Sequence, residues 1–337
     1  MSDQKIRVGV IGVGQMGTYH ARIYQDIHGV ELVALAESSE ERRSSLATEF
    51  PLVNIYSDYR ELIERDDIDA VSIVLPDNMH RDAVEMAVRH DKHILLEKPL
   101  TKDLDDAYAL YEILKDYDKV FTTGFLLRFD PRFSSIKDRI QSGKMGDIVH
   151  AYVRRNSPII GPRRYIGASD LSMHVMIHDI DYLNWWIDSP VEKVFAKSRS
   201  VRLSEYGMND VIYAILTYAN GVIACLEACW VLPENSPTII DDKVEIVGTK
   251  AVAYIDSCDY GVRFIEEEGT IEYPDSRHWY EVNGHIRGDL YEELNAFITN
   301  IVCEEKSIVT VEQSLESVKI VDAIERSLAE GREVTLD

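Results

Sequence analysis

The chain has 337 residues, of which 45% are hydrophobic, and this length allows two domains with sizeable cores. Acidic residues outnumber basic ones by 59 to 36, so the formal net charge of −23 argues against nucleic acid or an anionic membrane surface as a partner. We expect neither a membrane span nor a signal peptide, because no apolar run is long enough and glycines interrupt the first one. Four cysteines without a C-x-x-C pair predict reduced thiols and a cytoplasmic protein.

A glycine-rich turn follows the first apolar run, which occupies residues 6–11. Its glycines, Gly12, Gly14 and Gly17, have the G-x-G-x-x-G spacing, and residues 18–28 then predict a helix. In a dinucleotide site the first glycine permits a tight turn, the second lets the backbone approach phosphate, and the third lets helix and strand pack closely. The helix N-terminus adds N–H donors and the positive end of a dipole.

A carboxylate at the end of the second apolar run supports a dinucleotide site. The run occupies residues 30–36 and ends in Glu37, whose side chain can accept hydrogen bonds from the adenosine ribose hydroxyls. The same charge should repel a 2′-phosphate, so we expect NAD as the cofactor, with NADP as the alternative. An ordinary glycine turn beside an unrelated surface glutamate is the other interpretation.

Strands and helices continue to alternate as far as Gly124, which predicts a doubly wound parallel sheet with right-handed crossovers. The predicted strands are 54–56, 70–75, 93–96 and 120–123, and the predicted helices are 40–50, 58–64, 79–90 and 103–117. We therefore predict a Rossmann domain for dinucleotide binding over residues 1–124.

The pattern changes at residue 125 to α+β with a large, mostly antiparallel open sheet. The predicted strands are 147–155, 191–202, 210–218, 222–232, 241–247, 251–255 and 262–265, and the predicted helices are 131–142, 172–186, 288–302 and 311–329. Asn220 and Gly221 predict a hairpin turn between two of the strands. We therefore predict a domain for substrate binding and oligomerisation over residues 125–337.

The strand at 222–232 hardly alternates between apolar and polar residues, so we expect both of its faces to be covered. The domain's own helices can cover one face, and a second copy of the sheet can cover the other. A loop or a terminal helix is the alternative cover.

The predicted strand at 93–96 ends in Glu97, Lys98 and Pro99. Ligands of doubly wound sheets sit beyond the carboxyl ends of the strands, so Glu97 and Lys98 should lie near a bound nicotinamide. Lys98 is a candidate to interact with a substrate hydroxyl, because burial and charged neighbours can tune the pKa of a lysine. A solvated turn is the alternative interpretation.

The predicted helix at 172–186 carries His174 and His178 four residues apart, on one face. Such a pair can bind zinc, but the glutamate of zinc protease helices is missing and no further cysteine or histidine lies nearby in the sequence. We therefore predict no metal and a general acid–base role for His178. His174 is either a substrate residue or a packed, hydrogen-bonded histidine.

Together, the G-x-G-x-x-G turn, the E-K-P tripeptide at 97–99 and the sequence H-D-I-D at 178–181 with its following tryptophan pair resemble the glucose–fructose oxidoreductase and inositol dehydrogenase family, Gfo/Idh/MocA. The resemblance covers nearly the whole chain. It implies a Rossmann domain, a sheet that mediates dimers or tetramers, and hydride transfer between NAD(P) and a sugar, an inositol or a sugar derivative. It also implies that Lys98 is the catalytic lysine and His178 the catalytic histidine.

The motifs assign the remaining site residues. The expected cofactor-binding residues are Gly12, Gly14, Gln15, Met16, Gly17, Glu37, Pro76, Asn78, His80, Glu97 and Lys98, and the expected substrate residues are Arg128, Arg155, His174 and His178. His174 departs from the family, many of whose members carry an aspartate at that position. Arg128 and Arg155 could bind an acidic or phosphorylated sugar, and pairing with the chain's many carboxylates is the alternative.

We expect a metal-free dehydrogenase in which His178 removes the hydroxyl proton of a secondary alcohol while Lys98 orients and stabilises the oxygen. The expected assembly is a homodimer or homotetramer. Three alternatives stay open: a 3-dehydrogenase of UDP-amino-sugars, a non-catalytic NAD-binding regulator and a metal-dependent hydrolase. The sequence does not specify the sugar or polyol, the carbon oxidised or the physiological direction.

Overall fold

The computed structural model describes residues 5–162, 166, 169–257, 264–265 and 271–336. Cys258 and residues 262–263 of one predicted strand lie outside the described residues. The chain forms two compact units: unit 1 runs to Phe129 and includes Arg277–Leu315, and unit 2 comprises Asp130–Ser276 and the residues from Glu316 onward. This grouping differs from the expected division after residue 124, because a late segment of the chain belongs with the N-terminal unit.

Unit 1 is built on a six-stranded sheet in the order β3-β2-β1-β4-β5-β6, and every neighbouring pair is parallel. The strands are β1 (Ile6–Ile11), β2 (Val30–Ala36), β3 (Asn54–Tyr56), β4 (Ala70–Ile73), β5 (His93–Glu97) and β6 (Phe121–Gly124). The strand order reverses between β1 and β4, which is the switch point of a doubly wound sheet. The predicted fold of this unit is confirmed.

Helices connect these strands, as the alternating pattern predicts. They are α1 (Gln15–Asp26), α2 (Glu40–Glu49), α3 (Tyr59–Ile63), α4 (His80–Arg89) and α5 (Leu104–Leu114), with short 3₁₀ turns η1 (Asp77–Met79) and η2 (Leu126–Phe129). The first helix begins at Gln15 and not at residue 18, because Gly14 already occupies the N-cap position. The Asp58 side chain caps α3 by accepting from the backbone N–H of Arg60 at 2.9 Å.

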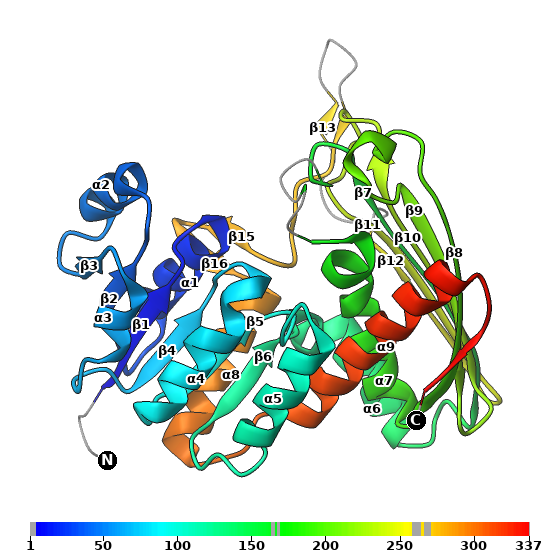
Figure 1. The fold of residues 1–337 in the computed structure, drawn as a ribbon, viewed down its shortest axis with the longest axis horizontal. Coiled ribbons are helices and arrows are strands. Elements are labelled where there is room, and N and C mark those ends of the chain that lie inside the picture. The colour runs from blue at the N-terminus through cyan, green and yellow to red at the C-terminus, as the bar shows by residue number, and fades with distance from the viewer. Residues whose placement is uncertain (1–4, 163–165, 167–168, 258–263, 266–270, 337) are drawn as a thin grey trace. The chain divides into compact units, whose positions relative to one another are not determined.

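The late segment joins unit 1 because its apolar side chains complete the core beside β1 and α1. It forms the hairpin β15 (Tyr280–Val282) and β16 (His285–Arg287), followed by α8 (Asp289–Cys303). Figure 1 shows this segment next to α1. Its buried side chains Ile286, Leu290 and Phe297 pack in one cluster with Val8 and Ile23. Each buried side chain of this size contributes roughly 1.5–3 kcal/mol of transfer free energy.

Unit 2 contains a seven-stranded sheet in the order β12-β11-β7-β10-β9-β8-β17. Its strands are β7 (Ile148–Pro158), β8 (Val191–Arg199), β9 (Val211–Tyr218), β10 (Ile223–Leu232), β11 (Asp241–Gly248), β12 (Val252–Asp256) and β17 (Val334–Thr335). All neighbouring pairs are antiparallel except β7 with β10. The expected hairpin is present: Gly221 has a φ of +87°, and the Tyr218 N–H donates to the Val222 carbonyl at 2.9 Å. The mostly antiparallel sheet is confirmed.

The helices of unit 2 are α6 (Pro131–Gln141), α7 (Ile177–Ile187) and most of α9 (Val311–Glu330). The predicted helix at 172–186 is two pieces, because Ser172–Met176 forms a π-helical turn, η4, before α7 begins. Phe133 of α6 lies between Tyr182 and Trp186 of α7, with ring centroids 4.7 and 5.6 Å away. A small two-stranded sheet of β13 (Phe264–Ile265) and β14 (Ile271–Glu272) completes the described elements.

Burial along β10 alternates strictly, which its sequence does not suggest. Ala224, Leu226 and Ala228 are buried, whereas Ile223 and Cys225 on the other face are exposed or half-buried. Within the described part of one chain, one face of β10 is therefore covered and the other is not, and cover of this second face by another copy of the sheet stays a prediction. Among the described helices, none has the length and apolarity that crossing a membrane requires.

Candidate active site

The glycine turn after β1 has the geometry that a pyrophosphate site needs. Gly12 has a φ of +83°, and a Cβ there would lie 2.4 Å from the Val74 carbonyl oxygen. A Cβ on Gly17 would lie 2.1 Å from the Gly12 carbonyl oxygen, so only glycine lets α1 approach the strand this closely. A Cβ on Gly14, by contrast, would meet no described atom within 4 Å. The turn therefore leaves open space at the exposed N-terminus of α1, where phosphate oxygens can accept from backbone N–H groups.

Glu37 lies at the carboxyl end of β2, beside the glycine turn. Its carboxylate accepts from the backbone N–H groups of Val13 at 3.1 Å and Ser39 at 2.9 Å. Arg42 crosses the same turn, because its guanidinium donates to the Val13 carbonyl at 2.7 Å and to the Thr18 hydroxyl at 3.0 Å. These contacts hold the carboxylate at the position predicted for the adenosine ribose.

The loops that follow β4 and β5 are held together by a buried histidine. The Nδ1 atom of His80 lies 2.9 Å from the Pro99 carbonyl oxygen, and its Nε2 atom lies 2.9 Å from the Leu75 carbonyl oxygen. The neighbouring Pro76 and Asn78 are exposed. Pro76 and Asn78 can therefore contact a ligand at this edge, whereas His80 fixes the loops that carry them.

Lys98 is half-buried between the buried residues Glu97 and Pro99. The Glu97 carboxylate accepts from the Lys98 backbone N–H at 3.2 Å. On its other side Glu97 contacts His20 of α1, whose Nε2 atom lies 3.1 Å away, and the His20 Nδ1 atom lies 2.7 Å from the Ser72 hydroxyl. Burial acts to raise the pKa of Glu97, but the hydrogen bond and charge of His20 and the charge of Lys98 lower it below its usual value. The sequence analysis identified Glu97 and Lys98 but missed His20 and Ser72.

Two histidines on the η4–α7 segment of unit 2 are partly accessible. His174 and His178 are half-buried, whereas Met173, Val175 and Asp179 around them are buried. The His174 ring lies 6.5 Å from the Trp230 ring, centroid to centroid. The π-helical turn adds a residue to one turn of helix and so changes the direction of the preceding side chains, a distortion common at functional sites.

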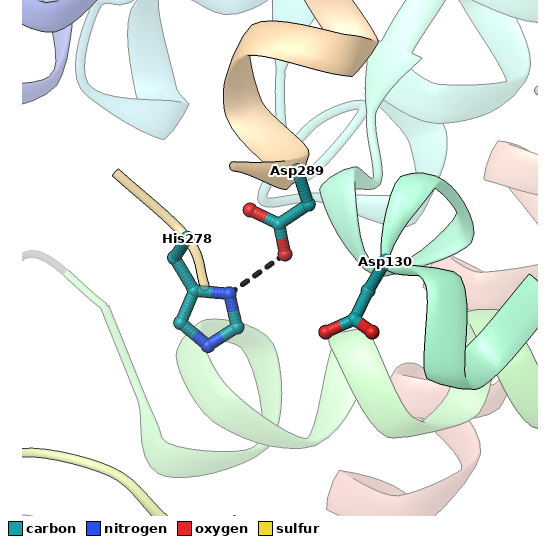
Figure 2. Close-up of side chains that lie close together, drawn as sticks. All are labelled: Asp130, His278 and Asp289. Carbon is teal, nitrogen blue, oxygen red and sulfur yellow. Dashed lines mark hydrogen bonds and ion pairs between the residues drawn. The ribbon is translucent and has the colours of Figure 1, made fainter. Parts of the chain in front are cut away.

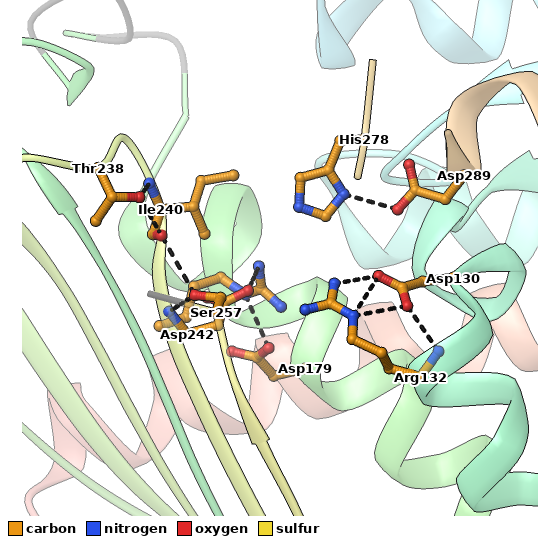
Figure 3. Close-up of polar contacts among 10 residues, drawn as sticks. Asp130, Arg132, Asp179, Thr238, Ile240, Asp242, Ser257, His278 and Asp289 are labelled. Atoms are coloured by element: carbon orange, nitrogen blue, oxygen red, sulfur yellow. Dashed lines mark hydrogen bonds and ion pairs between the residues drawn. The ribbon is translucent and has the colours of Figure 1, made fainter. Parts of the chain in front are cut away.

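Arg155 is buried, and it contacts two carboxylates, Asp179 and Asp242, which Figure 3 labels. Its guanidinium donates from Nε to Asp179 Oδ1 at 2.9 Å and pairs with Asp242 Oδ2 at 2.8 Å. The Asp242 N–H donates to the Ser257 hydroxyl at 2.6 Å. Burial raises the pKa of Asp179 to about 6, although Arg155 acts in the opposite direction. Two carboxylates thus share one guanidinium, so the expected binding of an acidic sugar by Arg155 lacks structural support.

Arg128, the other arginine expected to bind substrate, is only 2% exposed. Its NH1 group donates to the Ile308 carbonyl at 2.9 Å and to the Gln313 side-chain oxygen at 2.7 Å. The guanidinium therefore holds the chain that enters α9 and, like Arg155, has structural partners within its own unit.

The segment before α8 carries polar and aromatic groups that the sequence analysis missed. His278 Nδ1 lies 2.7 Å from the Asp289 carboxylate (Figure 2). The adjacent Trp279 stacks on Tyr19 of α1 with ring centroids 6.1 Å apart. Tyr19 also accepts a hydrogen bond from Gln15 at 3.1 Å, so this segment packs beside the start of α1. Neither helical nor alternating periodicity marks the segment, which is why its role could not be predicted.

Most of the expected cofactor residues thus lie together in unit 1, at the carboxyl edge of its sheet. The open space at Gly14, the α1 N-terminus, the carboxylate of Glu37 and the loops after β4 and β5 fit a dinucleotide laid across this edge. The residues expected on the substrate side, His174 and His178, belong to unit 2.

Comparisons with known proteins define the class. Residues 6–125 match the model of an oxidoreductase family with an NAD-binding Rossmann fold, and residues 133–254 match that of the GFO/IDH/MocA C-terminal domain. The protein is an NAD-dependent oxidoreductase acting on CH–OH groups. The chain belongs to the Gfo/Idh/MocA family, as its motifs predict.

Relatives and solved structures agree with this assignment. The chain is 28% identical to a myo-inositol 2-dehydrogenase of Thermotoga maritima, covering 98% of this chain and 99% of that protein. It is 28% identical to an NAD⁺-dependent scyllo-inositol 2-dehydrogenase of Bacillus subtilis, covering 75% and 74%. A probable dehydrogenase from Thermotoga maritima has the same fold, with a TM-score of 0.85, 27% identity and 98% coverage of both chains. A Lactobacillus casei scyllo-inositol dehydrogenase, solved with NAD(H) and scyllo-inositol, is similar in fold, with a TM-score of 0.85, 23% identity and coverage of 98% and 99%.

Proposed function

We propose that the protein oxidises a secondary hydroxyl of an inositol or a closely related neutral polyol, with NAD⁺ as the hydride acceptor. The observation that carries the proposal is the half-buried Lys98 at the end of β5, beside a glycine turn shaped for a dinucleotide. Two relatives of the chain, one of them full-length, are named inositol dehydrogenases. The burial and pairing of Arg128 and Arg155 favour an uncharged substrate over an acidic or phosphorylated sugar.

The proposed chemistry divides between the two units. A bound nicotinamide would supply the hydride acceptor. His178 acts as the general base that takes the hydroxyl proton, and Lys98 donates a hydrogen bond to the same oxygen and stabilises the negative charge that develops on it. His174 helps to orient the ring of the polyol. The proposal requires Lys98 and His178 to reach the same substrate.

We also propose that the protein works as a homodimer or homotetramer formed through the outer face of the large sheet of unit 2. A register row crosses six strands of this face, and apart from Glu245 of β11 it carries apolar and aromatic side chains, among them Tyr254 of β12, Tyr152 of β7 and Ile215 of β9. These three are 68%, 37% and 43% exposed, respectively. Exposed apolar and aromatic side chains gathered on one sheet face are typical of a protein interface.

The function is tested with a substrate panel and both cofactors. Purified protein is mixed with myo-inositol, scyllo-inositol, glucose, glucose 6-phosphate or a UDP-amino-sugar, together with NAD⁺ or NADP⁺, and the absorbance of reduced nicotinamide is followed. We expect the highest kcat/KM with an inositol and NAD⁺. Turnover only with the UDP-sugar or the phosphorylated sugar would overturn the assignment of a neutral polyol.

A further inference from the structure

A chain of buried polar groups runs through the core of unit 1 to the backbone of Lys98. It runs from Ser72 of β4 through His20 of α1 to Glu97 of β5, and Tyr24 of α1 lies beside it. Tyr24, His20 and Ser72 are fully buried, and Glu97 is 7% exposed. A polar network in such surroundings costs free energy unless its members satisfy one another, so its presence in an otherwise apolar core calls for a role.

Glu97 is the member of this network that faces the reactive edge. Its two carboxylate oxygens have different partners: Oε1 lies 3.1 Å from His20 Nε2, and Oε2 accepts from the Lys98 N–H. Gly124 of β6 packs against the carboxylate, since a Cβ there would be in van der Waals contact with it, 3.4 Å from its atoms. Glu97 can therefore not swing away from Lys98 without losing both contacts.

We propose that His20 is a positioning residue for Lys98. Ser72 holds one nitrogen of the His20 ring, and the other nitrogen anchors the Glu97 carboxylate. Glu97 in turn fixes the backbone of Lys98 and the electrostatic environment of its amine. This inference rests on the proposed function, in which Lys98 contacts the substrate oxygen. It assigns His20, which lies outside the glycine and E-K-P motifs, to the reaction.

The charges around Glu97 determine the sign of the effect. The titratable groups facing it are His20 and Tyr24 from α1 and Lys98 from its own strand end, and Glu293 of α8 acts on the network through Tyr24. An ionised Glu97 stabilises the protonated Lys98 amine. When His20 is removed, the buried carboxylate loses the donor that keeps it ionised, and burial then favours its neutral form. Loss of either residue should therefore make the Lys98 amine release its proton at a lower pH.

The test measures the titration of Lys98 directly, without a substrate. Full-length protein is acylated briefly with acetic anhydride over a pH series, and mass spectrometry of the peptide containing Lys98 gives the midpoint of the labelling curve. Glu97→Gln removes the charge and keeps the shape, whereas His20→Phe keeps a ring and removes both nitrogens. We expect each variant to lower the midpoint by about one pH unit, the usual scale for losing a neighbouring opposite charge. The double variant should match Glu97→Gln alone, because His20 acts through Glu97.

His93→Phe is the matched control, because this histidine lies at the opposite end of β5 and accepts at Nδ1 from the Val120 N–H. It should leave the Lys98 midpoint unchanged. If His20→Phe does not fold, the smaller polar variant His20→Asn replaces it. An unchanged Lys98 midpoint in Glu97→Gln overturns the inference. The inference is also overturned if removing His20 lowers the midpoint of Glu97→Gln by as much as it lowers that of the wild type.

The substrate panel separates this inference from the proposed function. A shifted Lys98 midpoint together with no oxidation of any polyol would refute the function and keep the role of His20. Oxidation of an inositol that depends on Lys98, with an unshifted midpoint in both variants, would refute the role of His20 and keep the function.

Discussion

Arg155 donates from Nε to Asp179 Oδ1 at 2.9 Å. Both side chains are buried, and Asp179 is the residue that follows the proposed catalytic histidine, His178. Since Asp242 also pairs with Arg155, the guanidinium neutralises two carboxylates only in part. This arrangement ties α7 to β7 and β11. Burial and the charge of Asp242 raise the pKa of Asp179, while Arg155 opposes them.

The first prediction concerns the pH dependence of stability. The pKa of Asp179 is raised to about 6 in the folded chain, above the value of about 3.9 for an unfolded one. Between these two pKa values the folded state binds more protons than the unfolded state. The stabilising contribution of Asp179 to the free energy of unfolding is therefore lost as the pH rises from about 4 through 6. The slope is at most about 1.4 kcal/mol per pH unit.

Urea unfolding from pH 4 to 7 checks this prediction in the wild type and in Asp179→Asn. The stability of the variant should fall less over this range, because it lacks the titrating carboxyl group. Asp138→Asn, at an exposed position on α6 of the same unit, should keep the wild-type slope. Equal slopes for Asp179→Asn and the wild type would contradict the prediction.

The second prediction compares two glycines of the phosphate turn. A methyl group on Gly17 would lie 2.1 Å from the Gly12 carbonyl, so Gly17→Ala should destabilise the fold by about 1–3 kcal/mol. A methyl group on Gly14 meets only open space in the protein, so Gly14→Ala should fold normally but bind NADH more weakly. Thermal unfolding without cofactor and fluorescence titration with NADH separate the two effects. Unchanged NADH affinity in Gly14→Ala would argue that the pyrophosphate does not approach this residue.

The glycine turn also illustrates what local sequence can predict. Its spacing, the alternation of strands and helices and the Asn220–Gly221 hairpin follow from short-range rules, and the structure confirms the elements that they predict. The π-helical turn before α7 could not be predicted in this way, because a single turn of five residues is too short to show its own periodicity.

Long-range pairing accounts for the other features that the sequence analysis missed. His20 occupies a helical position typical of core packing, and only its contacts with Ser72 and Glu97, 52 and 77 residues away, reveal a polar network. The packing of residues 277–303 against α1 likewise depends on side chains more than 250 residues apart, such as His285 and Asp26, 259 residues apart. The burial of Arg128 and Arg155 could not be predicted either, since their partners come from distant elements.

The third prediction concerns the choice of cofactor. The carboxylate of Glu37 is held by two backbone N–H groups at the end of β2, so its charge should repel the 2′-phosphate of NADP. We expect the wild type to prefer NAD⁺ and Glu37→Ser to raise the kcat/KM ratio of NADP⁺ to NAD⁺ roughly tenfold, or about 1.4 kcal/mol. Glu40→Ser, on the first turn of α2, should leave the ratio unchanged. Comparable kcat/KM values for both cofactors in the wild type would contradict a preference set by Glu37.

The fourth prediction concerns assembly. Ile215 lies in the exposed register row of the large sheet, between Cys225 and Phe195, so a charge there should disrupt an interface formed by this face. Light scattering should give the wild type a mass at least twice the 38.5 kDa of one chain and should give Ile215→Glu a lower mass. Leu52→Glu, at a 96% exposed position in unit 1, is the matched control and should behave as the wild type. A monomeric wild type at micromolar concentration would refute the proposal.

The fifth prediction concerns the proposed catalytic residues. Lys98→Ala should lower kcat by roughly 10²-fold or more, the usual scale for removing a positioned acid–base group. Binding of the adenosine half of NAD should persist, because it depends on the glycine turn and Glu37. His178→Ala should behave alike, and the double variant should lose less than the product of the two single losses, because residues that act as a unit are not additive. Single-turnover kinetics with the substrate found in the panel would provide these values.

His174→Ala is the comparison that decides how the two histidines of this segment work. If His174 only orients the substrate, the variant should raise KM more than it lowers kcat, and a chelator should have no effect on the wild type. A loss in kcat equal to that of His178→Ala, together with wild-type activity that a chelator removes and zinc restores, would instead indicate a metal held by the pair. Near-wild-type turnover in both Lys98→Ala and His178→Ala would show that the catalytic assignment is wrong, since a general base and the donor to the reacting oxygen cannot both be dispensable.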